Sequence, residues 1–150
     1  MFTLQSEVRL PASPGEIWPF FADPRNLELL TPRLLCFEMI NRAPIDMAVG
    51  TRIDYKLHIR GIPIRWQSEI TAWQPPHRFV DEQRRGPYRC WIHEHTFVPD
   101  GDGTIARDFV RYDHIGGRVV NNLWVKHDLR RIFRYRDKKL RKIFAPSGRS

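Results

Sequence analysis

Residues 86–97 read Gly-Pro-Tyr-Arg-Cys-Trp-Ile-His-Glu-His-Thr-Phe, and this stretch decides the fold. Side chains alternate between the two faces of a β-strand. One face of this segment therefore carries Trp91, His93, His95 and Phe97, with two imidazoles between two aromatic rings. If that face is directed inward, it forms a polar patch inside an aromatic cavity. Such a cavity suits the binding or chemical conversion of a small, mostly apolar molecule.

Turn-forming residues recur at strand-like intervals on both sides of this stretch. They are Gly50, Gly61, Pro75-Pro76, Gly86-Pro87 and Gly101, with apolar runs between them. This spacing is typical of an antiparallel meander. It predicts six strands, near residues 34–42, 51–60, 63–73, 78–85, 88–98 and 104–113. In the second of these strands apolar and polar side chains alternate, so we expect a sheet that is buried on one face only.

A further strand and two short helices are predicted before the meander. Residues 2–10 alternate well enough to form the strand. Ser13 is a typical N-cap, and Glu16 completes a capping box with it. Asp23 can cap a second helix, which Thr31-Pro32 would end.

A long helix is predicted after Gly116-Gly117. Apolar residues recur there at steps of three and four, and lysines and arginines fill the other side. About 27 residues at about 1.5 Å each extend roughly 40 Å, so this helix should cross the buried face of the sheet. Residues 145–150 are expected to form a frayed tail. The predicted inward residues of the helix are Val120, Leu123, Trp124, Leu129, Ile132, Phe133, Leu140, Ile143 and Phe144.

The composition favours one globular domain over residues 1–150. The chain is 41% hydrophobic and 28% charged, and it is long enough to bury roughly two thirds of its unfolded surface. No apolar run approaches the ~20 residues of a transmembrane helix, and the N-terminal segment lacks secretory-signal features, so we expect a cytoplasmic protein. Cys36 and Cys90 have no metal-site spacing and are expected to be reduced.

The positive charge is concentrated in the predicted C-terminal helix. The formal net charge is +8, and residues 126–142 alone hold nine lysines or arginines against two aspartates. Such a stripe could attract nucleic acid or an anionic membrane surface. A solvated outer helix face is the favoured interpretation, because the basic residues are not interleaved with exposed aromatics that could stack on bases. Nucleic acid is therefore not the expected partner.

Several motifs resemble those of a known superfamily. They are residues 10–18 (Leu-Pro-Ala-Ser-Pro-Gly-Glu-Ile-Trp), Ala22-Asp23-Pro24, Trp73-Gln74-Pro75-Pro76, and residues 79–83 (Phe-Val-Asp-Glu-Gln) followed by Gly86-Pro87-Tyr88. Together with the predicted element order, they resemble the SRPBCC or START-like superfamily, and within it small bacterial proteins labelled cyclase/dehydrase. The resemblance implies an α+β helix-grip fold, in which a curved seven-stranded antiparallel sheet wraps around a long C-terminal helix. It also implies a deep cavity between the sheet and the helix.

Strand phase assigns further residues to the inner face. If His93 and His95 point inward, the neighbouring strands contribute carboxylates to the same side. We predict a buried polar network of Asp81, Gln83, His93, His95, Asp108 and Tyr112, with Tyr55, Trp66, Trp91 and Phe97 as its aromatic wall.

Three interpretations of this network remain open. The Asp and His pairs could be purely structural. In a catalytic interpretation, His93 and His95 act as general acid or base, oriented by Asp81 and Asp108. In a ligand-binding interpretation, Gln83 and Tyr112 join the network in holding the polar end of a bound molecule, while the aromatic residues hold its body.

The pair His93-Glu94-His95 also raises the question of a metal ion, since imidazoles at i and i+2 can reach one ion. Glu94 points to the opposite face and a turn follows at Pro99, so no carboxylate ligand follows on the same strand. We therefore expect no metal and no cofactor. The prediction is a domain that binds a small hydrophobic or aromatic ligand, polyketide- or lipid-like, with cyclase/dehydrase chemistry open and a monomeric or homodimeric state undecided.

Overall fold

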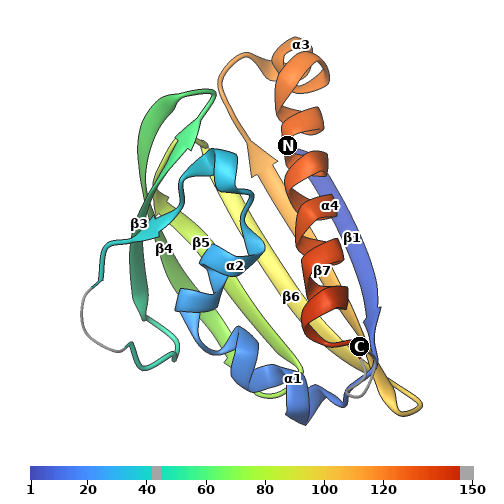
Figure 1. Ribbon diagram of the computed structural model, residues 1–150. Helices are drawn as coiled ribbons and strands as arrows, with labels where there is room; N and C mark the ends of the chain where they lie inside the picture. The colour runs from blue at the N-terminus through green and yellow to red at the C-terminus, as the bar shows by residue number, and fades with distance from the viewer. Residues whose placement is uncertain (42–44, 146–150) are drawn as a thin grey trace.

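The structure, a computed structural model, describes residues 1–41 and 45–145. Its centre is a seven-stranded sheet in the order β1-β7-β6-β5-β4-β3-β2, in which all neighbours are antiparallel (Figure 1). The strands are β1 (Phe2–Leu10), β2 (Glu38–Met39), β3 (Arg52–Ile59), β4 (Ile62–Gln74), β5 (Arg78–Arg85), β6 (Cys90–Asp100) and β7 (Gly103–Asp113). With the long C-terminal helix, this sheet forms the predicted α+β helix-grip fold.

Short helices connect β1 to β2. They are α1 (Pro14–Phe21), the 3₁₀ turn η1 (Pro24–Asn26), α2 (Leu27–Leu30) and the 3₁₀ turn η2 (Arg33–Leu35). Ser13 caps α1, because its Oγ accepts the backbone N–H of Glu16 at 3.3 Å and donates to the Glu16 carboxylate at 3.0 Å. The Asp23 carboxylate accepts the backbone N–H of Arg25 at 3.0 Å. Both predicted helix starts are therefore confirmed.

The strand predicted at residues 34–42 is wrong for most of its length. The turn η2 occupies Arg33–Leu35, Cys36 has a left-handed backbone with φ 49°, and only Glu38–Met39 pairs with β3. Residue 42 lies outside the described residues. A short apolar run such as Leu34-Leu35 does not by itself distinguish a strand from a helical turn, and Pro32 presets a turn here.

The C-terminal helix extends without a break from α3 (Gly117–Val120) through the π-helical segment η3 (Asn121–Val125) to α4 (Lys126–Ile143). It lies along β1 and β7 (Figure 1). The prediction of an inward position is wrong for Ile143, which is 37% exposed at the end of α4, and for Leu123 and Trp124, which are 58% and 49% exposed. A π turn places its hydrogen bonds five residues apart, so it shifts the phase expected from a 3.6-residue period. Asn121 takes the inward position instead and is 5% exposed.

Arg136 corrects a second expectation for this helix. Basic side chains were predicted to occupy only its outer side, yet Arg136 is 7% exposed and points inward with Leu129, Phe133 and Leu140. Its position follows from its spacing, because residues 129, 133, 136 and 140 share one helix face. The guanidinium of Arg136 is therefore buried between α4 and the sheet.

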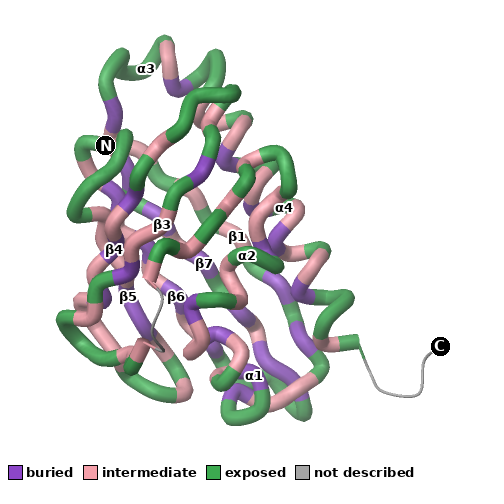
Figure 2. Tube along the Cα trace, turned by 60° about the vertical axis from the view of Figure 1, so that its left-hand side comes forward, coloured by how far each residue is buried: buried purple, intermediate pink, exposed green. Residues whose placement is uncertain are grey.

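The apolar core is divided into two clusters along β6. Phe97 belongs to a cluster with Ile17 at the α1 end, and Trp91 belongs to a cluster with Phe133 under α4. Figure 2 shows the buried residues in purple along the central strands and on α4. His93 and His95 lie between Trp91 and Phe97 on β6, so the two apolar clusters are separated by a polar belt. No helix within the described parts of the chain is long and apolar enough to span a membrane.

Candidate functional site

The polar belt is built from three adjacent strands. His93 and His95 on β6 are 6% and 3% exposed. In the strand register, His93 lies opposite Asp81 of β5, and His95 lies opposite Asp108 of β7. The central strand therefore carries two imidazoles, and the strands on either side each carry one carboxylate on the same face.

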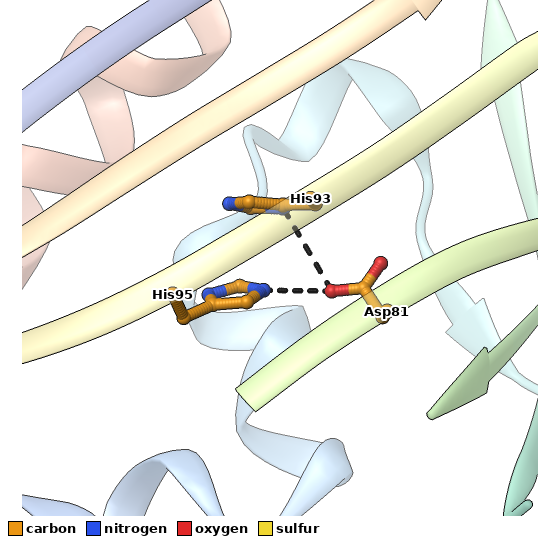
Figure 3. A group of neighbouring side chains, drawn as sticks. All are labelled: Asp81, His93 and His95. Carbon is orange, nitrogen blue, oxygen red and sulfur yellow. Dashed lines mark hydrogen bonds and ion pairs between the residues drawn. The ribbon is translucent and has the colours of Figure 1, made fainter. Parts of the chain in front are cut away.

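Each imidazole is held by a carboxylate. His93 Nε2 lies 2.8 Å from Asp108 Oδ1, and His95 Nε2 lies 2.7 Å from Asp81 Oδ2. Figure 3 shows His93 and His95 on the same side of Asp81, with the two rings stacked. The ring centroids are 3.7 Å apart at an interplanar angle of 26°. This close stacking couples the charge states of the two rings.

The hydrogen bonds assign the tautomer of His93. An ionised carboxylate only accepts hydrogen bonds, so Nε2 of His93 carries the proton that is donated to Asp108. Nδ1 of neutral His93 then carries a lone pair that can accept a proton. The Asp81 oxygen facing this atom is 3.8 Å away, which is too far for a hydrogen bond. Nδ1 of His93 therefore has no hydrogen-bond partner within residues 1–41 and 45–145 and can act as a base.

The surroundings shift the two imidazole pKa values in opposite directions. Burial, followed by the charge of neighbouring His95, lowers the pKa of His93 below its ordinary value. Burial acts on His95 in the same sense, but hydrogen bonds to Asp108 and Asp81 outweigh it and raise the pKa of His95. His95 can donate from Nε2 to Asp81 and, when protonated, from Nδ1 to Asp108 at 3.3 Å. Of the two rings, His95 is therefore the one that binds a proton more readily.

Both carboxylates remain ionised. Burial opposes the charge on Asp108, yet Arg136 and the hydrogen bonds from the two histidines hold its pKa well below the ordinary value. Burial also opposes the charge on Asp81, but the pKa of Asp81 is lowered overall, and the hydrogen bond from His95 is the largest cause of the lowering.

Arg136 completes the cluster from α4. Its Nη2 lies 3.4 Å from Asp108 Oδ1 and 3.4 Å from His95 Nδ1, and both contacts are long. Its Nε is buried and has no hydrogen-bond partner among the described residues. The guanidinium carbon lies 5.7 Å from the ring centroid of Phe21. Sequence analysis missed this residue, although its place in the apolar stripe of the helix is a usable signal.

Two adjoining hollows lie beside this cluster, and only the smaller one is lined by its residues. The smaller, of about 100 Å³, is lined by Asp81, His93, His95 and Arg136 together with apolar residues of α2 and the sheet. The larger, of about 730 Å³, lies between β3, α4 and the η2 region and is mainly apolar and aromatic. Tyr55 and Trp91 border both hollows, and Trp66 borders the larger one. The predicted aromatic wall thus includes these three residues.

Three predicted site residues lie elsewhere. Gln83 binds the backbone of Tyr88 through both ends of its amide, at 2.7 and 3.1 Å. The Tyr112 hydroxyl donates to Asn121 Oδ1 at 2.8 Å, and Phe97 belongs to the core near α1 and lines neither hollow. Strand phase predicted the correct face for all three. The polar groups of Gln83 and Tyr112 nevertheless bind other partners, and Phe97, although next to His95 on the same face, packs in the core near α1.

Ser68 is a polar residue of the smaller hollow that sequence analysis did not select. It is 3% exposed, and its Oγ accepts the indole N–H of Trp66 at 3.0 Å and lies 3.3 Å from the Tyr55 hydroxyl. A lone serine in an alternating strand carries no distinctive signal. It positions two rings that border the larger hollow.

Asp81, His93 and His95 are the residues that could hold a metal ion, because one potential ligand atom from each lies within 4.8 Å of the others. Two histidines and one carboxylate form a common ligand set for divalent ions. The contact of 2.7 Å between His95 Nε2 and Asp81 Oδ2 is, however, a hydrogen-bond length. His95 and Asp81 are therefore joined by a hydrogen bond, and the cationic Arg136 lies beside them.

Comparison with solved structures supports the fold. Protein CV1439 from Chromobacterium violaceum has a TM-score of 0.76 at 16% identity, covering 97% of this chain and 98% of that chain. Protein Ms6760 from Mycobacterium smegmatis has a TM-score of 0.69 at 20% identity, covering 94% and 89%. Major latex-like protein 151 from Panax ginseng has a TM-score of 0.71 at 10% identity, covering 97% and 98%. At these identities the likeness concerns the fold alone.

Comparison with protein families and curated proteins gives a family but no individual relative. No curated protein matches the chain. A family model described as polyketide cyclase/dehydrase and lipid transport matches residues 1–144, which is nearly the whole chain. The resemblance inferred from the sequence motifs is thereby confirmed, and the protein belongs to the polyketide cyclase/dehydrase and lipid-transport family.

Proposed function

We propose that the protein binds a small hydrophobic or aromatic molecule, polyketide- or lipid-like, with its body in the larger hollow and its polar end at the His93–His95 pair. The larger hollow has the size and the apolar lining of a ligand site. The smaller hollow adjoins it through Tyr55 and Trp91 and adds the titratable groups. We expect a cytoplasmic protein that is a monomer or a homodimer.

We further propose that the imidazole pair performs acid–base chemistry on this ligand. The observation that carries the proposal is geometric: His93 Nδ1 has no hydrogen-bond partner among the described residues, and its ring stacks on that of His95, whose two nitrogens lie 2.7 and 3.3 Å from carboxylate oxygens. Two titratable groups whose environments separate their pKa values are suited to act as base and acid. His93 Nδ1 would take a proton from a carbon next to a carbonyl, and His95 would stabilise the negative charge that develops on the oxygen. Enolisation of this kind is the step that cyclisation and dehydration share.

Proton exchange tests the chemistry directly. An apolar β-diketone, 1,3-diphenylpropane-1,3-dione, exchanges its central C–H protons with deuterium, and ¹H NMR follows the loss of signal. We expect the wild-type protein to accelerate this exchange and His93→Gln to abolish the acceleration. His114→Gln is the matched control, since His114 is also buried but hydrogen-bonds Asn121 outside the cluster. Equal rates for wild type and His93→Gln would contradict the catalytic role.

Binding is tested separately by extraction and mass spectrometry of small molecules that co-purify. Trp91→Ala should lose them, because Trp91 borders both hollows. Ligand retention by the His93→Gln variant would separate binding from chemistry. Absence of apolar small molecules in the wild type, together with no binding of added 1-naphthol, would contradict the binding proposal.

An anionic membrane surface is a second candidate partner, favoured by one observation. The exposed apolar side chains Ile115, Val119, Leu123 and Trp124 project near the start of the basic helix, and they are between 49% and 74% exposed. Apolar residues beside cations are typical of interfacial binding. The double substitution Leu123→Gln/Trp124→Gln should reduce co-sedimentation of the protein with phosphatidylserine vesicles. Equal binding to phosphatidylserine and phosphatidylcholine vesicles would contradict the electrostatic part of this proposal.

A further inference from the structure

Arg136 has more hydrogen-bonding capacity than its surroundings use. Its side chain is 9% exposed, so it is more than nine-tenths buried. A guanidinium has five N–H donors in a fixed plane. Among the described residues, Nη2 lies 3.4 Å from Asp108 Oδ1 and 3.4 Å from His95 Nδ1, and Nε has no hydrogen-bond partner. When His95 is protonated its Nδ1 is a donor, so of these two contacts only Asp108 can accept from Arg136. A buried, unsatisfied cationic donor is costly unless a ligand completes its hydrogen bonds.

The position of Arg136 indicates where such a ligand would lie. Its side chain borders the smaller hollow together with His93, His95 and Asp81. A planar guanidinium binds oxyanions well. The group that completes Arg136 is therefore an oxygen with negative charge, located within the same small space as the free Nδ1 of His93.

The charge balance of the cluster restricts whether the ligand's oxygen enters the site as an anion or as a neutral O–H group. Asp81 and Asp108 bring two negative charges and Arg136 brings one positive charge. His95 can bring a second positive charge, because carboxylate oxygens lie 2.7 and 3.3 Å from its two ring nitrogens, and the cluster is then neutral when His93 is neutral. A preformed anion such as a carboxylate would bring an uncompensated charge into a buried site, which is unfavourable. A weak acid that enters neutral leaves the total charge unchanged, provided that it leaves its proton inside.

We propose that the ligand carries a weakly acidic O–H, an enol or a phenol, and that it binds as the oxyanion on Arg136 with its proton on His93. The inference rests on the proposed function, since it needs an apolar molecule in the adjoining hollow. In this step the O–H bond of the ligand breaks, its electron pair remains on the oxygen, and a new N–H bond forms at His93 Nδ1. No other reactant is needed, and the transfer reverses when the ligand leaves.

The experiment uses 4-nitrophenol, whose phenol and phenolate have distinct absorption bands. At a pH well below the solution pKa of this compound, the wild-type protein should produce the phenolate band on binding. 4-Nitroanisole has the same ring but no O–H, and it should bind about tenfold to a hundredfold more weakly, the factor expected for one charge-assisted hydrogen bond. Tryptophan quenching measures both affinities, because Trp91 borders the smaller hollow and Trp66 the larger one.

Arg136→Gln should abolish the phenolate band, and Arg134→Gln is the matched control on the exposed side of the same helix. If Arg136→Gln does not fold, Arg136→Lys keeps a positive charge and should retain the band with weaker affinity, while the wild-type comparison of the two ligands remains decisive. Bound neutral phenol, equal affinity for 4-nitroanisole, or an unchanged band in Arg136→Gln would overturn the inference and leave an apolar binding site intact. No binding of either compound would overturn the proposed function and this inference with it.

Discussion

His93 and His95 stack with their ring centroids 3.7 Å apart, yet each ring donates from Nε2 to a different aspartate on a different strand. Without a bound anion to offset their charge, two cations at this separation would repel each other strongly in a buried site. An extra proton on the pair is therefore expected on His95, whose two ring nitrogens lie 2.7 and 3.3 Å from the carboxylates of Asp81 and Asp108. Because the two rings differ in protonation, the pair has a base and an acid side by side.

The pKa order of the pair is directly measurable. In an NMR titration of the imidazole signals, we expect His95 to titrate above the ordinary histidine value and His93 below it. Asp81→Asn should lower the pKa of His95, because it removes one of the two carboxylates that stabilise the cation. Glu94→Gln is the control, since Glu94 lies between them in sequence but on the opposite face. The opposite order would contradict the acid and base assignment.

Asp108 should make the protein sensitive to acid. Its folded pKa lies well below that of an unfolded chain, so its stabilising effect is complete above about pH 5 and is lost as the pH falls through the folded value. Asp108→Asn should lower the free energy of unfolding at pH 7 by about 3–5 kcal/mol, the cost of breaking a buried charge pair. Its denaturation midpoint should also depend less on pH between 5 and 3. Asp102→Asn, at a side chain that is 98% exposed, should match the wild type.

Tyr112→Phe distinguishes a structural role from a binding role. The Tyr112 hydroxyl donates to Asn121 in the π-helical segment, so its loss should cost about 1–2 kcal/mol of unfolding free energy. Affinity for 1-naphthol should not change, because Tyr112 borders neither hollow. A large loss of affinity at unchanged stability would support the ligand-binding role predicted from the sequence.

Gln83 should stabilise the loop between β5 and β6. Its amide accepts the N–H of Tyr88 and donates to the Tyr88 carbonyl, so Gln83→Ala should speed hydrogen exchange at the Tyr88 amide roughly fivefold to tenfold. Gln74→Ala, at an exposed position of β4, is the control. The Gly86→Ala substitution should have a similar effect, because a Cβ there would lie 2.5 Å from Gln83 Oε1. Unchanged exchange at Tyr88 in both variants would show that this amide does not hold the loop.

Metal analysis tests the expectation that the site works without an ion. We expect purified protein to carry zinc or iron at well below one equivalent, and EDTA to leave the melting temperature unchanged. One equivalent of metal that is lost in Asp81→Asn would instead assign Asp81, His93 and His95 as ligands.

The sequence by itself determined the fold and the face of each strand in the site. Period-two alternation predicted that Trp91, His93 and His95 share a face, and capping residues such as Ser13 and Asp23 predicted where the helices begin. These signals are local, since they depend on backbone geometry within a few residues. They hold in any tertiary context that keeps the strand or helix intact.

Only the tertiary structure decided which residues meet. Strand register placed Asp81 opposite His93 and Asp108 opposite His95, whereas Gln83, although on the same face, binds the Tyr88 loop instead. Arg136 lies in a basic segment, and its inward direction depends on how α4 packs on the sheet. The π-helical turn at Asn121–Val125 likewise rotates Leu123 and Trp124 outward. Register, helix packing and a local change of helical period depend on contacts between distant segments, and a one-dimensional pattern does not contain those contacts.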